Sequence, residues 1–131
     1  MLYKPAPLKK GSKIGVVAPA KPIDMAILDY AKACVDKLSY ELIYPKNYNA
    51  SYGYLAGNDS ERAGAFMDLW LDDSIDAIWC FAGGYGSMRL LDKLDFEKIK
   101  QNPKIFIGMS DITALHIALL QKASLVTYLG P

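Results

Sequence analysis

The sequence predicts an α/β fold in which a doubly wound, mostly parallel sheet forms the middle of three layers, as in flavodoxin-like and Rossmann-like domains. Short apolar runs alternate with segments whose apolar residues recur at helical spacing, a pattern typical of parallel sheets. The run at 75–81 is apolar almost throughout, which indicates a strand covered on both faces. With 131 residues, the chain has the length of a single domain.

Each predicted element has a local signal that starts or ends it. We expect strands at 13–18, 40–44, 75–81, 105–107 and 125–129, and helices at 25–38, 59–71, 96–100 and 111–122. Pro19 and Pro45 end the first two strands, because proline cannot donate to a sheet. Asp24 is placed to cap the first helix, and Asn58 with Glu61 has the spacing of a capping box for the second.

The composition of the chain excludes several kinds of binding partner. The chain is 52% hydrophobic and 22% charged, with a net charge of +1 and no basic cluster, so we expect neither nucleic acid nor a membrane as a partner. No apolar stretch reaches transmembrane length, and no signal-peptide pattern follows the first lysines. Cys34 and Cys80 have neither CxxC nor metal-ligand spacing, so we expect no metal site and buried thiols in a reducing compartment, the cytoplasm. We expect no cofactor.

A serine stands at a sharp predicted strand-to-helix turn. The apolar run 105–107 is followed by Gly108, Ser110 and Asp111, and then by a helical pattern. Such a turn presents a serine on an exposed tip, beside the unpaired first N–H groups of the helix, which can hold an oxyanion. Ser110 is therefore a candidate nucleophile. The alternative is that Ser110 and Asp111 only cap the helix, since both residue types are good caps.

The glycine-rich loop at 83–86 is a second candidate site segment. Ligands of open α/β sheets bind beyond the carboxyl ends of the strands, where we expect residues 18–20, 82–86 and 108–111 to meet. Glycines allow backbone N–H groups to approach a ligand closely, as an oxyanion hole or a phosphate nest requires. The loop matches neither GxGxxG nor the P-loop pattern, so nucleotide binding is weakly supported. A tight strand-to-helix turn is the structural alternative.

A serine nucleophile needs a base, and no residue of the chain is clearly placed to be one. His116, the single histidine, lies six residues beyond Ser110 on the predicted helix, which separates them by about 9 Å along the axis and about 240° around it. We therefore expect His116 to lie on the helix surface or to pack in the core. Lys21 is a candidate partner in a Ser–Lys pair, although a solvated loop lysine is its default role, and Asp111 serves the helix dipole. We expect the base to lie outside this chain.

Seven segments form a pattern together, although each is a weak signal alone. They are GVVAPA at 15–20, YLAGNDSER at 54–62, IDAIWC at 75–80, GGYG at 83–86, RLL at 89–91, NPK at 102–104 and GMSDITAL at 108–115. In this order they resemble the serine LD-carboxypeptidases, a family that includes the muramoyl-tetrapeptide carboxypeptidases and the microcin C self-immunity peptidases. The resemblance runs from about residue 11 to the end of the chain.

The resemblance implies a two-domain enzyme with a Ser–His–Glu triad. The family's nucleophile falls on Ser110, and its oxyanion donors fall on the backbone N–H groups of Asp111 and Gly84. The rest of the substrate loop falls on Gly83, Tyr85 and Gly86. The histidine and glutamate belong to a C-terminal domain with no counterpart in residues 1–131, so His116 is not the catalytic histidine.

Two positions depart from the family pattern. Ala82 stands where the family usually has arginine before the paired glycines. This change removes a carboxylate or loop-orienting contact and puts substrate affinity in doubt. Leu129 stands where histidine often precedes Gly-Pro, and this change affects packing at the domain junction.

The resemblance implies hydrolysis of the bond before a C-terminal D-amino acid in a murein-derived peptide, a step of peptidoglycan recycling. Because residues 1–131 lack the triad's histidine and glutamate, we expect the isolated chain to be inactive. A related amidase acting on peptidyl-nucleotides and a non-catalytic small-molecule binding module are the alternatives. Residues 125–129 end the chain with an apolar strand that a further domain would cover. We therefore expect the front part of a longer enzyme and, in isolation, a homodimer or aggregates.

Overall fold

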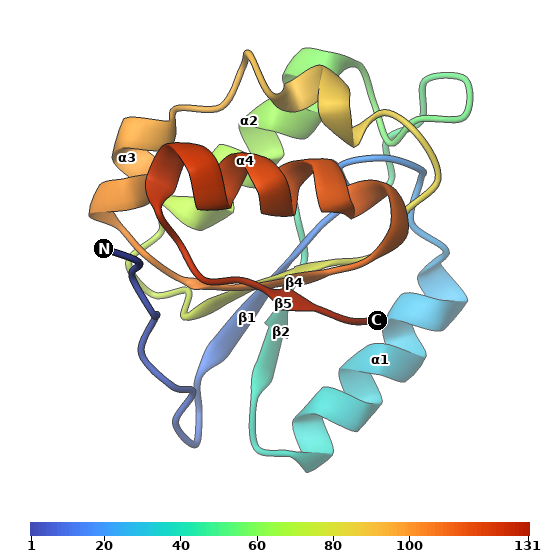
Figure 1. The fold of residues 1–131 in the computed structure, drawn as a ribbon. Coiled ribbons are helices and arrows are strands. Elements are labelled where there is room, and N and C mark those ends of the chain that lie inside the picture. Colours follow the sequence, from blue (N-terminus) through green and yellow to red (C-terminus); the bar gives the residue numbers. More distant parts are fainter.

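A five-stranded, fully parallel sheet forms the centre of the computed structural model, which describes residues 1–131 (Figure 1). The strands are β1 (Lys13–Val17), β2 (Glu41–Ile43), β3 (Ala77–Cys80), β4 (Ile105–Gly108) and β5 (Tyr128–Leu129). Their order is β2-β1-β3-β4-β5, so the direction of winding reverses between β1 and β3. This is the doubly wound order of flavodoxin-like folds, and the predicted α/β class is confirmed.

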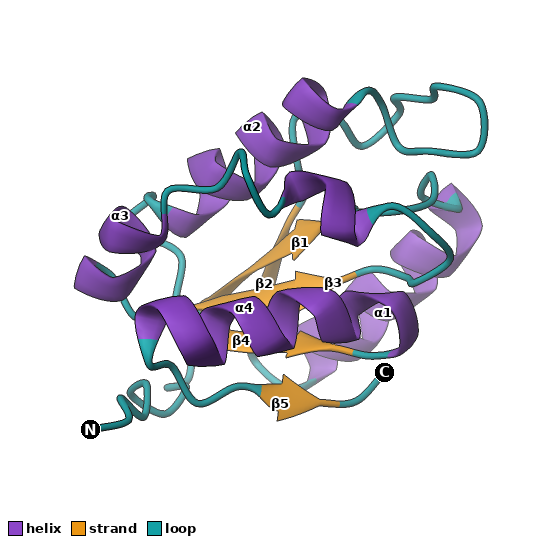
Figure 2. Cartoon of the chain, turned by 45° about the horizontal axis from the view of Figure 1, so that its top comes forward, coloured by secondary structure: helices purple, strands orange, loops and turns teal.

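Four α-helices and two 3₁₀ turns connect the strands. The helices are α1 (Met25–Lys37), α2 (Asp59–Trp70), α3 (Phe96–Gln101) and α4 (Thr113–Ala123), and the 3₁₀ turns are Ser87–Leu90 and Ser110–Ile112. Helices α2, α3 and α4 lie on one face of the sheet and α1 lies on the other (Figure 2). The predicted caps are confirmed, because Asp24 accepts from the amides of Ala26 and Ile27, and Asn58 with Glu61 forms the capping box. None of these helices combines the length and the apolar run that crossing a membrane requires.

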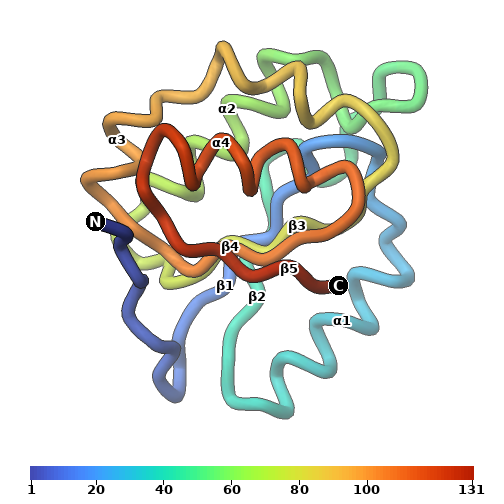
Figure 3. Tube along the Cα trace, in the orientation of Figure 1, coloured from blue at the N-terminus to red at the C-terminus, as the bar shows by residue number.

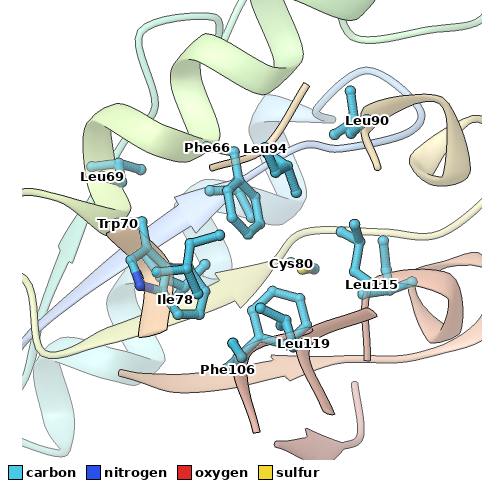
Figure 4. Close-up of a cluster of buried hydrophobic side chains, with 14 of the residues drawn as sticks. Phe66, Leu69, Trp70, Ile78, Cys80, Leu90, Leu94, Phe106, Leu115 and Leu119 are labelled. Carbon is cyan, nitrogen blue, oxygen red and sulfur yellow. The ribbon is translucent and has the colours of Figure 1, made fainter. Parts of the chain in front are cut away.

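Most of the hydrophobic core lies between the sheet and helices α2, α3 and α4 (Figure 4). This side contains a cluster of 17 buried residues, whereas the α1 side contains a cluster of six. Phe66, Trp70 and Phe106 pack together within the larger cluster, and the rings of Phe66 and Trp70 stack at 5.4 Å. The larger cluster includes Ile78 of β3 and Phe106 of β4. It therefore anchors the two strands that lead into the candidate site.

The C-terminal strand is shorter than the sequence predicts. Only Tyr128–Leu129 forms β5, whereas the prediction extended back to Leu125. Leu125 is instead buried and pairs with Tyr3, whose backbone also bonds to Ser124 and Val126. The N-terminal segment, in dark blue, thus lies close to the segment that leads from α4 to β5 (Figure 3). The N-terminal segment thus occupies the hydrogen-bonding positions that a longer strand would have used.

Candidate active site

The loops that follow β1, β3 and β4 meet at the carboxyl edge of the sheet, as the sequence predicts. They border a pocket of about 410 Å³, a volume typical of small-molecule sites. The first loop contributes Lys21, the second contributes Ala82, Gly83 and Gly84, and the third contributes Met109 and Ser110. The pocket therefore lies at the switch point of the sheet, where open α/β sheets bind ligands.

Ser110 has a backbone conformation that few residues other than glycine adopt. Its φ angle is 60°, in the left-handed region, at the step from β4 into the 3₁₀ turn. This conformation costs roughly 1–2 kcal/mol. Ser39 and Ser124 also have positive φ, but each follows a helix, where this is common. The Ser110 side chain is exposed, and neither it nor the Asp111 side chain caps the 3₁₀ turn Ser110–Ile112 or α4, so the alternative that these residues only cap the following helix is wrong.

Gly108 allows the serine turn to fold back over the strand that precedes it. A β-carbon at this position would lie 2.5 Å from Cγ2 of Ile112 and 3.1 Å from Cβ of Cys80. The first of these contacts is closer than real side chains allow, so only glycine fits here. Ile112 is fully buried and anchors the turn in the core, while Ser110 stays at the surface.

Two hydrogen bonds join the serine turn to the segment that follows the glycine-rich loop. The amide of Ser87 donates to Oδ2 of Asp111 over 3.0 Å, and the hydroxyl of Ser87 donates to the carbonyl oxygen of Asp111 over 2.7 Å. Ser87 is fully buried, so water does not compete for these bonds. The Asp111 carboxylate therefore holds the two loops together, a role that the sequence did not reveal.

The glycine-rich loop lies directly against Ser110, which confirms that the two predicted segments meet. A β-carbon on Gly83 would lie 3.2 Å from Oγ of Ser110 and 3.3 Å from the amide nitrogen of Asp111. Gly84 and Gly86 have φ angles of 109° and 111°, which glycine adopts without strain. Gly83 thus keeps open the space beside both the serine hydroxyl and the next backbone N–H group.

The buried Arg62 connects the loops around the site through hydrogen bonds, a role that the sequence did not indicate. Its side chain is 0% exposed, and it pairs with Asp59. It donates to the carbonyl oxygens of Pro19 at 2.6 Å, Gly86 at 3.0 Å and Gly57 at 3.1 Å. Burial lowers the pKa of the Arg62 guanidinium, and the Asp59 carboxylate opposes this effect. Arg62 therefore ties the loop after β1 to the glycine-rich loop.

Polar and aromatic side chains surround the far end of the glycine-rich loop. Asp59 accepts a hydrogen bond from Nε of Arg89 at 2.9 Å, and this bond lowers the pKa of the Asp59 carboxyl. Hydrogen bonds to Asp59 and Tyr85 raise the pKa of Arg89. The ring of Tyr85 lies 5.9 Å from that of Tyr54, and both side chains are exposed. Of the predicted substrate loop, Gly83 and Gly84 line the pocket, whereas Tyr85 is exposed outside the lining and Gly86 is buried against Arg62.

His116 has structural partners on both ring nitrogens, which confirms its packing role. Nε2 donates to the carbonyl oxygen of Gly108 over 2.8 Å, and Nδ1 bonds to the hydroxyl of Thr127 over 2.7 Å. The ring also packs edge-on against Phe106, with centroids 5.1 Å apart. His116 therefore joins α4 to β4 and to the segment before β5.

The sheet order and the pocket at its switch point define the class of the protein. It is a flavodoxin-like α/β domain with a pocket at the carboxyl edge of the sheet, where domains of this class bind their ligands. The peptidase S66 family, described as the LD-carboxypeptidase N-terminal domain, matches residues 14–130. The chain therefore belongs to the LD-carboxypeptidase family, as its N-terminal domain.

Several relatives are similar over nearly the whole chain. The probable murein peptide carboxypeptidase of Bacillus subtilis (strain 168) is 43% identical over 129 residues, which are 98% of this chain and 40% of the relative. An MccF-like protein from Bacillus anthracis str. Ames has a TM-score of 0.94 at 32% identity, over 98% of this chain and 40% of that one. MccF in complex with glutamyl sulfamoyl guanosine has a TM-score of 0.87 at 32% identity, over 94% and 38%. The chain thus spans about 40% of the length of these relatives.

Proposed function

We propose that residues 1–131 are the nucleophile-bearing N-terminal domain of a serine LD-carboxypeptidase. The observation that carries this proposal is the position of Ser110, which is exposed on a strained turn at the edge of the pocket. Gly83 packs beside its hydroxyl and beside the next backbone N–H group. A serine on such a turn is accessible to a substrate carbonyl and has oxyanion donors close at hand.

In the proposed mechanism, Oγ of Ser110 attacks the carbonyl carbon of the bond before a C-terminal D-amino acid. The backbone N–H groups of Asp111 and Gly84 donate to the oxyanion of the tetrahedral intermediate. A histidine oriented by a glutamate accepts the serine proton and passes it to the leaving amine, after which water hydrolyses the acyl-serine ester. We assign that histidine and glutamate to a C-terminal domain. The reaction uses protein groups alone and requires no metal or cofactor.

We propose murein-derived peptides as the substrate class and the cytoplasm as the place of the reaction. The similar protein from Bacillus subtilis is named a probable murein peptide carboxypeptidase, which supports this choice. A second candidate is hydrolysis of the amide bond in a peptidyl-nucleotide. The similarity to MccF in complex with glutamyl sulfamoyl guanosine favours that alternative.

The two candidates are separated by a substrate comparison with a two-domain form, in which residues 1–131 are followed by the C-terminal part of the Bacillus subtilis relative. We expect this form to release D-alanine from an L,D-linked tetrapeptide and to leave an aminoacyl sulfamoyl adenosine intact. Free D-alanine and free adenosine sulfamate are measured in parallel by chromatography. Cleavage of the nucleotide analogue alone would favour the amidase over the carboxypeptidase as the function. Cleavage of neither substrate would contradict both proposed functions.

Gly83→Ala is expected to lower kcat/KM of the two-domain form by about tenfold or more while the protein stays folded. The new methyl group would lie 3.2 Å from Oγ of Ser110, where the reacting carbonyl has to enter. The matched control is Gly64→Ala, because nothing lies within 4 Å of a β-carbon at that exposed position of α2. Steady-state kinetics and thermal unfolding are measured for both. Unchanged kinetics in Gly83→Ala would show that the space beside Ser110 is not used.

We also propose that apolar surface near β5 is covered by a partner. The sequence predicts that residues 125–129 form an uncovered apolar strand, but Leu125 is buried. The exposed apolar side chains of this region are Tyr128 and Leu129 on β5 and Ile117 and Leu120 on α4. Large exposed apolar patches usually mark an interface, and we propose that these side chains contribute to one. We expect the isolated chain to form a homodimer or larger species by light scattering. A clean monomer at high concentration contradicts this.

A further inference from the structure

Lys21 is the one charged residue that lines the pocket beside Ser110. It follows the buried Ala20, and its exposed side chain takes part in none of the ion pairs of the structure. A β-carbon on Gly84 would lie 3.4 Å from Cβ of Lys21 and 3.7 Å from both its Cγ and its Cδ. The aliphatic part of Lys21 thus rests on the glycine-rich loop, and its ammonium group is left without an anionic partner.

The other side chains that line the pocket carry no positive charge that could attract an anion. Ala82 contributes a methyl group and Met109 a thioether, while Gly83 has no side chain. An enzyme that removes the last residue of a peptide has to accommodate a carboxylate next to the scissile bond. A lysine ammonium supplies both the counter-charge and the hydrogen-bond donors for it.

We propose that Lys21 binds the terminal carboxylate of the peptide substrate and so restricts the enzyme to chain ends. This inference rests on the proposed carboxypeptidase function and deepens it, because it names the group that recognises the free C-terminus. A Ser–Lys pair, in which Lys21 acts as the base, is the competing role. The two roles differ in kinetics: a carboxylate-binding lysine affects substrates with a free C-terminus through KM, whereas a base affects every substrate through kcat.

The kinetic test compares an L,D-linked tetrapeptide with the same peptide ending in a carboxamide, both cleaved by the two-domain form. For Lys21→Ala we expect KM for the free acid to rise by about tenfold with little change in kcat, since one charge-assisted contact is lost. The carboxamide is expected to be cleaved equally by both proteins. Lys21→Arg is expected to restore most of the preference for the acid. Lys10→Ala, an exposed lysine before β1, is the matched control and is expected to change nothing.

A binding measurement provides a readout that does not depend on turnover. In the Ser110→Ala background of the 131-residue chain, calorimetry or NMR titration is expected to show tighter binding of the acid than of the carboxamide. Lys21→Ala is expected to abolish that difference. Normal cleavage of the acid with unchanged KM in Lys21→Ala, or a collapse of kcat on both substrates, overturns the inference while the proposed function stands. Failure of the two-domain form with unmodified Lys21 to release D-alanine overturns both.

Discussion

Ser110→Ala is expected to lower D-alanine release by the two-domain form by at least about 10⁴-fold. The substitution removes the oxygen that forms the acyl-enzyme, while the pocket and its backbone donors remain. The isolated 131-residue chain is expected to release no D-alanine above background. Its single histidine, His116, is held by Gly108 and Thr127 and is not available to a nucleophile.

The matched control for this substitution is Ser39→Ala. Ser39 has a φ angle of 66°, close to the 60° of Ser110, but it lies in the turn after α1, remote from the pocket. Both variants therefore make the same side-chain change at the same kind of backbone angle. We expect Ser39→Ala to retain full activity. Turnover by the isolated chain, or full activity of Ser110→Ala, would overturn the assignment of the nucleophile.

Arg62→Met is expected to lower the free energy of unfolding by about 3–5 kcal/mol. Methionine fills a similar volume but leaves the carbonyl oxygens of Pro19, Gly57 and Gly86 without the donor they have now. It also removes a buried cation and leaves its partner Asp59 with only the exposed Arg89. Urea unfolding followed by circular dichroism measures the change.

Two further variants separate the role of the buried guanidinium from the effect of losing a surface charge. Arg89→Met removes an arginine that is 49% exposed and pairs with the same Asp59, and we expect it to cost less than about 1 kcal/mol. Arg62→Lys keeps the charge but lacks the planar set of donors that reaches three carbonyl groups, so we expect an intermediate loss. An Arg62→Met protein within about 1 kcal/mol of the unmodified chain would show that these hydrogen bonds contribute little.

Several features of the candidate site were predictable because their causes are local in the sequence. The strand at 105–107, followed by Gly108 and Ser110, indicated a turn with an exposed serine, and helical spacing alone separated His116 from that serine. The capping signals at Asp24 and Asn58 placed the starts of α1 and α2. These features depend on backbone preferences and on residue periods over a few positions, which the sequence displays directly.

The connections between distant loops depended on the tertiary structure. Arg62 lies four residues before the buried Phe66, on the core-facing side of α2, so helical spacing predicts that it is buried but not what it binds. Its partners Pro19 and Gly86 are 43 and 24 positions away in the chain. They reach it only because the loops after β1 and β3 emerge at one edge of the sheet.

The sequence alone determines three features of this protein: the alternation of strands and helices, the serine at the strand-to-helix turn, and the exclusion of His116 as the base of that serine. The tertiary structure decided that Ser87 holds Asp111, that Tyr3 displaces the expected start of β5 from Leu125, and that Lys21 rests on the loop beside Ser110. The physical reason is the range of the forces involved. Turns and helix starts are set by neighbouring residues, whereas these contacts exist only once the order and register of the parallel strands bring separate loops within hydrogen-bonding or van der Waals distance.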